Sequence, residues 1–502
     1  MSLMSALARM EALTTGRAQP LATRRHFRLA GEPLVIVPLK MAGEAAAPLA
    51  ALVGTSRREP QLIFAPQPRN RDLRFAFFGD LAKAVLGEIA ARQVGVESVE
   101  RKNDDPFQRF LDAPQLLVPN RPGMEFLRLL GRSTRFRQTG GEWPVPEAVP
   151  LLGRWLTWFS DRSEYPGSSV LCAMTDLLST HWATGQSALE DGNLAALLGW
   201  IDPPPGRTGP QAAKDAEDPL VQPPAGPSTD PSFDNEVLAP LIASYDQSQE
   251  GPGRDHAADR IRKAILSQVE PTWELMWQGI DLLRALPEAG SVTARFEGDR
   301  TSFSLFEASM EEGVPQARKD SAVAAARRLA SLEGQASRYA VQRALDDPLI
   351  MAEHRLSGEA FAGDVVWADP DHVNEKDRPR PLLRISTTDA LRAEPGAVLH
   401  NAARKQKAIV REIGADGVLV ELQDGMGRAK KPALGTVPEL GEAVCFTTFA
   451  DEFRPGSTLP DADETPWTHG GPPEPYEAPA EVVTEEMSAQ IIEVPAPAKE
   501  LP

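Results

Sequence analysis

The side chains of this chain that could bind a charged ligand are concentrated in one basic stretch, HNAARKQKAIVREIGADGVLVELQDGMGRAKKP, from His400 to Pro432. Closely spaced Lys and Arg residues on strands and turns can hold nucleic-acid phosphates without reading bases. We therefore expect its basic residues to bind nucleic-acid phosphates: Arg404, Lys405, Lys407, Arg411, Arg428, Lys430 and Lys431. Few aromatic residues accompany them, which argues against a standard barrel that stacks on single strands.

A second group of candidate ligands follows short apolar runs in the N-terminal region. The runs PLVIVPL (33–39), PQLIFAPQ (60–67) and PQLLVPN (114–120) each end at a proline before a polar loop. Ligands of α/β sheets bind beyond the strand ends. Arg69, Arg71 and Arg74 fall in or just after such a loop, so we add them to the candidate nucleic-acid-binding residues.

The common catalytic and cofactor motifs do not fit this chain. Gly425 and Gly427 lack the third glycine and the following helix of a phosphate-cradling loop. A metal-dependent nuclease needs an acid where VIVPLK has Pro38, two residues before Lys40. The histidines are dispersed, and His181 lies on an apolar stripe typical of a core histidine. We predict no catalytic residue, metal ligand or cofactor.

The net charge of −18 is unevenly distributed. Residues 1–140 carry 21 basic and 13 acidic side chains, residues 376–411 carry 9 and 3, and residues 451–502 carry 2 and 12. Such asymmetry is consistent with nucleic-acid contact by the basic parts. Arg supplies 41 of the 53 basic residues, which suggests a bacterium with GC-rich DNA. Two isolated cysteines and no long apolar run favour a cytoplasmic protein without membrane contact.

The order of patterns predicts a multidomain α+β protein. Residues 1–201 are expected to form an α/β layer with a helical extension, since helical spacing follows the strands in 45–54, 72–90 and 123–136. Residues 202–232 have the composition of a Pro/Gly-rich linker. Residues 233–380 are expected to be a helical domain, residues 381–450 a small β-barrel or curled sheet, and residues 451–502 a disordered acidic tail.

Local signals place the main elements of the second half. Apolar residues spaced by three and four predict one long amphipathic helix: Ala322, Ala325, Leu329, Leu332, Ala336 and Tyr339. The runs KAIVREI (407–413) and VLVELQD (418–424) predict a hairpin whose turn contains Asp416 and Gly417. With 382–386 and 443–449 this makes about four strands.

The long helix followed by a small basic barrel resembles the stalk-and-barrel insertion of some superfamily 1 helicases, in which a barrel grips nucleic acid. The resemblance covers residues 319–449 and rests on layout, without the motor itself. It implies a non-catalytic accessory or adaptor subunit of a nucleic-acid-processing system, beside a separately encoded motor or nuclease. Two alternatives stay open: a purely protein-binding scaffold, and an enzyme with its site at the strand ends of the N-terminal domain.

Overall fold

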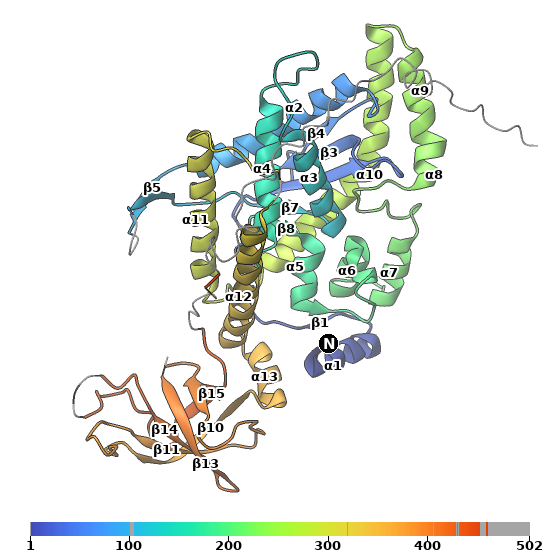
Figure 1. Cartoon of the computed structure of the whole chain (residues 1–502). Coiled ribbons are helices and arrows are strands. Elements are labelled where there is room, and N and C mark those ends of the chain that lie inside the picture. Colours follow the sequence, from blue (N-terminus) through green and yellow to red (C-terminus); the bar gives the residue numbers. More distant parts are fainter. Residues whose placement is uncertain are drawn as a thin grey trace, which may run out of the picture. The chain divides into compact units, whose positions relative to one another are not determined.

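The computed structural model of this chain describes residues 2–100, 105–318, 320–404, 406–427, 429, 431–451 and 458–459. Residues 1–314 and 334–453 belong to one compact unit, and residues 315–333 belong to another. The fold mixes helices with sheets and includes a separate closed barrel, as the predicted fold class requires (Figure 1). Within the described residues, no helix is long and apolar enough to cross a membrane.

A five-stranded sheet forms the centre of the N-terminal region. Its order is β4 (Gln61–Phe64), β3 (Pro48–Gly54), β2 (Leu34–Lys40), β7 (Leu116–Val118) and β8 (Leu171–Ala173). Strands β2, β7 and β8 are parallel, whereas β3 is antiparallel to β2 and β4. The three strands expected from the apolar runs are confirmed.

The helix expected over 45–54 is wrong, because this segment is strand β3. Its Ala-rich sequence has good helical propensity, but six of its seven residues are buried between β2 and β4. A strand buried on both faces reads as a continuous apolar run and is hard to distinguish from a helix by period alone.

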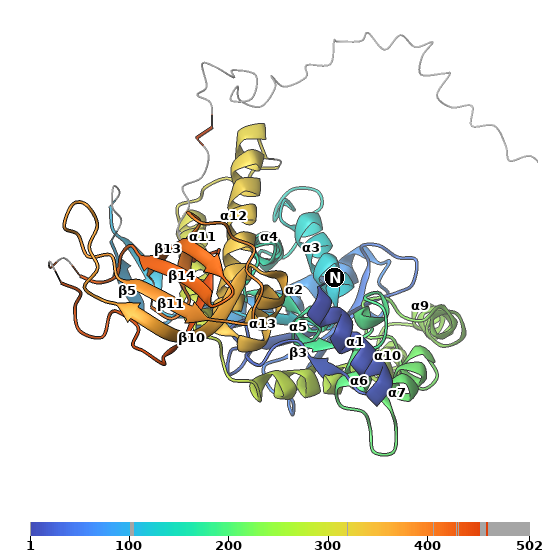
Figure 2. The ribbon, with the colours of Figure 1, turned by 90° about the horizontal axis from the view of Figure 1, so that it is seen from below.

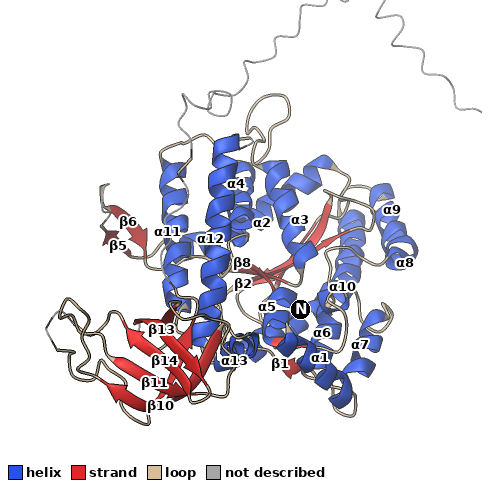
Figure 3. Cartoon of the chain, turned by 60° about the horizontal axis from the view of Figure 1, so that its bottom comes forward, coloured by secondary structure: helices blue, strands red, loops and turns tan. Residues whose placement is uncertain are grey.

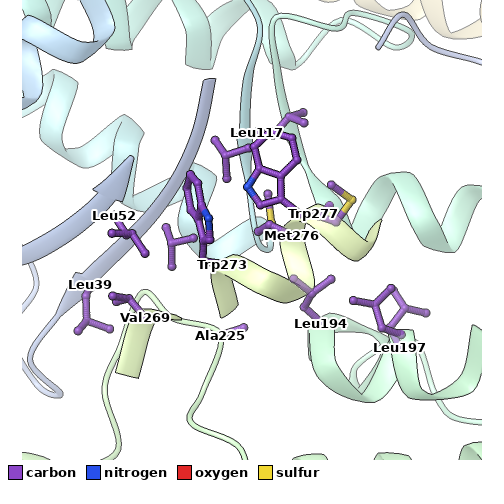
Figure 4. Packing of buried hydrophobic residues seen from close by; sticks show 14 of the residues in the cluster. Leu39, Leu52, Leu117, Leu194, Leu197, Ala225, Val269, Trp273, Met276 and Trp277 are labelled. Atoms are coloured by element: carbon purple, nitrogen blue, oxygen red, sulfur yellow. The ribbon is translucent and has the colours of Figure 1, made fainter. Parts of the chain in front are cut away.

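Helices cover both faces of the sheet, as expected. Alternate residues of β2 point to opposite sides: Leu34 and Ile36 join a core with α2 (Arg71–Arg92), α3 (Arg121–Thr134) and α4 (Ala148–Ser163). Val35 and Val37 join the other core, which includes α5 (Met174–His181), α6 (Leu194–Ile201) and α10 (Pro252–Arg284). Figure 4 shows Trp273 and Trp277 of α10 beside Leu52 and Leu117 of the sheet.

The predicted linker, residues 202–232, is part of this fold. It contains α7 (Gly209–Glu217), which lies beside α6 (Figure 2) and buries Ala212 and Ala213. Ala225 belongs to the same core as α10, which follows in the sequence. The expectation of a linker is therefore wrong, because its apolar residues find burial that composition alone does not reveal. Whether the predicted domains fold independently remains a prediction.

Shorter elements complete the N-terminal region. Helix α1 (Leu3–Thr15) precedes β1 (Gln19–Pro20), which pairs with β9 (Trp182–Ala183). Strands β5 (Val96–Val99) and β6 (Phe107–Phe110) form a separate hairpin. The remaining short helices are η1 (Glu190–Gly192), α8 (Pro231–Phe233), the π-helix η2 (Asp234–Leu238) and α9 (Ala239–Gln247).

The helical region predicted for 233–380 ends earlier than expected. It contains α11 (Val292–Glu311), α12 (Ala322–Asp346) and α13 (Pro348–Ser357), but residue 360 already begins a strand. Helix α12 is the predicted amphipathic helix. Tyr339 on its stripe packs against the guanidinium groups of Arg295 and Arg343, whereas Leu329 is 57% exposed.

The C-terminal strands form a closed six-stranded barrel in the order β10-β11-β14-β13-β12-β15. The strands are β10 (Ala360–Asp369), β11 (Leu382–Ser386), β12 (Val398–Asn401), β13 (Lys407–Gly414), β14 (Gly417–Leu422) and β15 (Ala443–Thr447). Figure 3 shows β10, β11, β14 and β13 side by side. The hairpin is confirmed, and Gly417 has a φ of 116° at its turn. β10 and β12 were missed, so the barrel begins near residue 360 rather than 381.

The predicted disordered tail, residues 451–502, lies outside the described residues except for Asp451, Thr458 and Leu459. The Asp451 carboxylate accepts hydrogen bonds from Arg338 Nε at 2.7 Å and Gln342 Nε2 at 2.8 Å. Within the described part of this acidic segment, Asp451 therefore contacts helix α12.

Candidate nucleic-acid interface

Three of the predicted basic residues that the structure describes in the barrel lie beside acids of the same barrel. Arg411 on β13 pairs with Glu421 on β14 at 2.7 Å, and Arg404 pairs with Glu442 at 2.6 Å. Lys431 lies 3.9 Å from Asp371. The backbone N–H of Lys407 donates to Asp424 Oδ1 at 2.6 Å. Lys405, Arg428 and Lys430 lie outside the described residues.

The charge of the barrel as a whole agrees with this pairing. Residues 360–449 contain 12 Lys and Arg and 13 Asp and Glu, a net charge of −1. The surplus in 376–411 is local, because strand register brings later acids such as Glu421 next to earlier arginines. A phosphate would have to displace these carboxylates, so the barrel is a weaker candidate interface than its sequence suggests.

The three N-terminal candidate residues have different surroundings. Arg69 Nε donates to Glu44 Oε1 at 2.9 Å, which partly neutralises it. Arg71, the first residue of α2, pairs with its neighbour Asp72 and donates from Nη2 to the carbonyl oxygens of Trp143 and Pro144. Arg74 has no ion pair within the part of the chain that the structure describes. Arg71 thus connects the start of α2 with the loop between α3 and α4.

That loop contains an arginine-lined groove that sequence reasoning missed. The groove has a volume of about 600 Å³ and lies beside the end of α3 and the start of α4. We call it the arginine groove; its lining consists of Arg135, Phe136, Arg137, Gln138, Thr139, Gly140, Gly141, Pro150 and Arg154. No acidic side chain belongs to this described lining, and no described carboxylate pairs with the three guanidinium groups.

Aromatic rings lie against three of the arginines in and beside the groove: Arg71, Arg135 and Arg137. The Arg135 guanidinium lies 4.6 Å from the centre of the Phe136 ring, and that of Arg137 lies 5.7 Å from Phe75. Arg71 lies between Phe75 at 4.8 Å and Trp143 at 5.7 Å. Stacking on a ring fixes a guanidinium through its face and leaves its N–H groups at the edge available to an oxygen ligand.

Part of this arrangement also stabilises helix α3. Arg137 Nε donates to Ser133 O at 3.0 Å, and cations near a helix C-terminus interact favourably with its dipole. Capping of the helix accounts for the position of one N–H group of Arg137. It does not account for three arginines lying together without an acidic side chain in the groove lining. The sequence signal was present in GRSTRFRQTGGEW, where basic and aromatic residues alternate before a glycine pair. This signal is hard to recognise because the segment begins in helix α3 and ends in the following loop.

Among the described residues, the ends of the sheet strands do not bring several acidic side chains together. At the carboxyl edge of β2, the carbonyl oxygen of Pro227 accepts a hydrogen bond from the Lys40 N–H. The Thr229 N–H donates a hydrogen bond to the carbonyl oxygen of Lys40. Asp234 accepts hydrogen bonds from the Ala42 N–H and the Thr229 hydroxyl. Asn120, beyond β7, caps α3 and donates to Gly226 O. These groups are used in holding the chain together, which gives no support to an enzyme at this edge.

A buried histidine pair lies elsewhere in the same unit. His26 Nε2 is 3.4 Å from Asp347 Oδ2, and the His26 N–H donates to His181 Nε2 at 3.3 Å. His181 Nδ1 lies 2.7 Å from Leu177 O, so this nitrogen carries the proton. Both histidines and Asp347 are fully buried, and burial lowers the pKa of each histidine to about 4. The prediction that His181 is a core histidine is confirmed.

Among the residues that the structure describes, no three His, Cys, Asp or Glu side chains are grouped so as to hold a metal ion. No family model, curated protein or solved structure matches this chain.

Proposed function

We propose that this protein is a non-catalytic, cytoplasmic accessory subunit of a nucleic-acid-processing system, and that it binds backbone phosphates beside a separate motor or nuclease. The observation that carries the proposal is the arginine groove, where Arg135, Arg137 and Arg154 gather without an acidic partner. Arg71, which pairs with Asp72, holds the neighbouring loop through the Trp143 carbonyl oxygen. The barrel residues Arg404, Lys407 and Arg411 are secondary ligands in this proposal.

The groove chemistry suits an oxyanion such as a backbone phosphate. Each guanidinium can offer a planar pair of N–H donors to phosphate oxygens. Phosphate contacts release counterions, so binding of a single strand weakens with a logarithmic salt slope of about 0.7 for each contact. Three contacts then correspond to a loss of about 20-fold between 50 and 200 mM salt.

The test measures binding of the full chain to labelled single- and double-stranded DNA and RNA by fluorescence anisotropy across a salt series. The variant R135E/R137E/R154E should abolish low-salt binding. A matched variant with the same charge change, R207E/R260E/K263E, alters exposed basic residues outside the groove and should retain it. Absence of low-salt binding by the unmodified chain, or equal loss in both variants, would refute the proposal.

The contribution of the barrel is measured separately with K405E/K407E/K430E. If this variant loses binding and the groove variant does not, the barrel is the interface and the groove is not. Loss of two units of salt slope in the groove variant R135A/R137A/R154A, with an unchanged slope for the barrel variant, would support the groove.

A protein-binding scaffold is the second candidate, and helix α1 favours it. Leu3, Leu7 and Met10 follow one another by four and three residues, which places them on one side of the helix, and all three are exposed. An exposed apolar helix face is typical of protein interfaces. Binding through it should be nearly insensitive to salt and should be lost in L3E/L7E/M10E, in contrast to phosphate binding by the groove.

A further inference from the structure

Trp143 is an exposed aromatic residue next to the arginine groove. Its side chain is 67% exposed although it is the largest apolar side chain of the α3–α4 loop. Single exposed hydrophobic residues are common on proteins and need no explanation by themselves. What distinguishes Trp143 is its position, two residues after the Gly140–Gly141 pair of the groove and beside the guanidinium of Arg71.

The backbone that carries Trp143 is held in place by hydrogen bonds of residues 143–145. Arg71 Nη2 donates to Trp143 O at 2.9 Å and to Pro144 O at 3.2 Å. The next residue, Val145, is buried, and its N–H donates to Gln138 O at 3.1 Å. The indole ring therefore projects from an anchored loop, so that little conformational freedom would be lost when a flat ligand stacks on it.

We propose that the arginine groove takes a single-stranded nucleic acid, with one base stacked on Trp143 and the backbone phosphates on Arg135, Arg137 and Arg154. This inference rests on the function proposed above. In a duplex both faces of each internal base are covered by neighbouring bases, so an internal base can offer a face to the indole only where the strand is unpaired. Base stacking does not depend on the sugar, and the chemistry named here is common to DNA and RNA.

The ionic and stacking contributions separate in a salt series. Arginine contacts set the salt slope, whereas stacking on a neutral ring contributes affinity without releasing counterions. Removal of Trp143 should therefore lower single-strand affinity at every salt concentration and leave the slope unchanged. Removal of one groove arginine should reduce the slope by about 0.7.

The experiment compares the full chain with W143A and W143F on 20-nucleotide single strands, on blunt duplexes and on single strands in which every base is replaced by an abasic residue. W143A should bind single-stranded DNA and RNA about tenfold more weakly, within the range found for loss of a stacking ring. W143F should keep much of the affinity. W367A, which removes the 46% exposed Trp367 of β10, is the matched control and should have no effect.

The abasic strand makes the test independent of misfolding. The full chain should bind it about as weakly as W143A binds the normal strand, and W143A should show no further loss on the abasic strand. If the full chain binds normal and abasic strands equally, or if W143A weakens duplex and single-strand binding alike, the stacking proposal is refuted. Salt-dependent binding lost only in R135E/R137E/R154E would then still support phosphate binding, whereas no binding to any strand would refute both.

Discussion

Protonation of His26 and His181 should destabilise the protein as the pH falls from 7 to 5. In the unfolded chain each imidazole has its ordinary pKa of 6.5, whereas burial lowers that pKa to about 4 in the folded chain. Between these values protons bind more strongly to the unfolded state. The stability contributed by the neutral histidines is therefore fully present above pH 6.5 and is lost as the pH falls towards 4.

The size of the effect follows from these pKa values. For one histidine with a pKa of 6.5 unfolded and about 4 folded, the free energy of unfolding falls by about 2 kcal/mol between pH 7 and pH 5. Two independent histidines would lose about 4 kcal/mol. Their rings stack with centres 6.1 Å apart, so the charge of the first protonated ring opposes protonation of the second ring in the folded chain.

Urea unfolding at pH 7, 6 and 5 measures this loss, followed by tryptophan fluorescence and circular dichroism. The variant H26Q/H181Q keeps polar side chains but cannot be protonated in this range. It should be less stable than the unmodified chain at pH 7 and should have a nearly flat stability between pH 7 and 5. An equal fall in the unmodified chain and in H26Q/H181Q would show that the pair does not control acid stability, and would refute the reasoning.

Three further predictions concern packing and backbone geometry. Arg295→Met should lower the free energy of unfolding by about 3 kcal/mol in urea titrations, because it leaves Gln342 Oε1 and a buried backbone carbonyl without their guanidinium donor. Gly417→Ala should cost at least about 2 kcal/mol, measured by thermal unfolding, because a Cβ would lie 2.1 Å from Ile385 O at a φ of 116°. Gly334→Ala should have the opposite sign and stabilise by about 0.8 kcal/mol, since its Cβ would meet open space within α12; a melting temperature below that of the unmodified chain would contradict this.

Local patterns were sufficient where an element is specified by its own residues. The hairpin of β13 and β14 could be predicted because alternating apolar residues flank a turn with a glycine that adopts positive φ. β3 and β10 could not, for different reasons. The Ala-rich segment of β3 becomes a strand only through its neighbours, and β10 contains Gly363 and charged residues that hide its buried positions.

The candidate site divides in the same way. The basic residues of 400–432 were visible in the sequence, but the neutralising partner of Arg411 is chosen by strand register, which places Glu421 within 2.7 Å. Trp143 and Arg71 are 72 positions apart, and only the packing of α2 against the α3–α4 loop brings them together. Ala213 and Ala225 likewise become buried in a core that includes residues of α10, which lies later in the chain.

The sequence by itself determined strands β2, β4 and β7, the long helix α12, the hairpin and the uneven charge, because these depend on residues within about one helical or strand repeat of each other. The tertiary structure alone decided which of those charges are neutralised and which remain available. Pairing between charges is a matter of a few ångströms across the folded chain, and the interaction falls with that distance and with exposure to water.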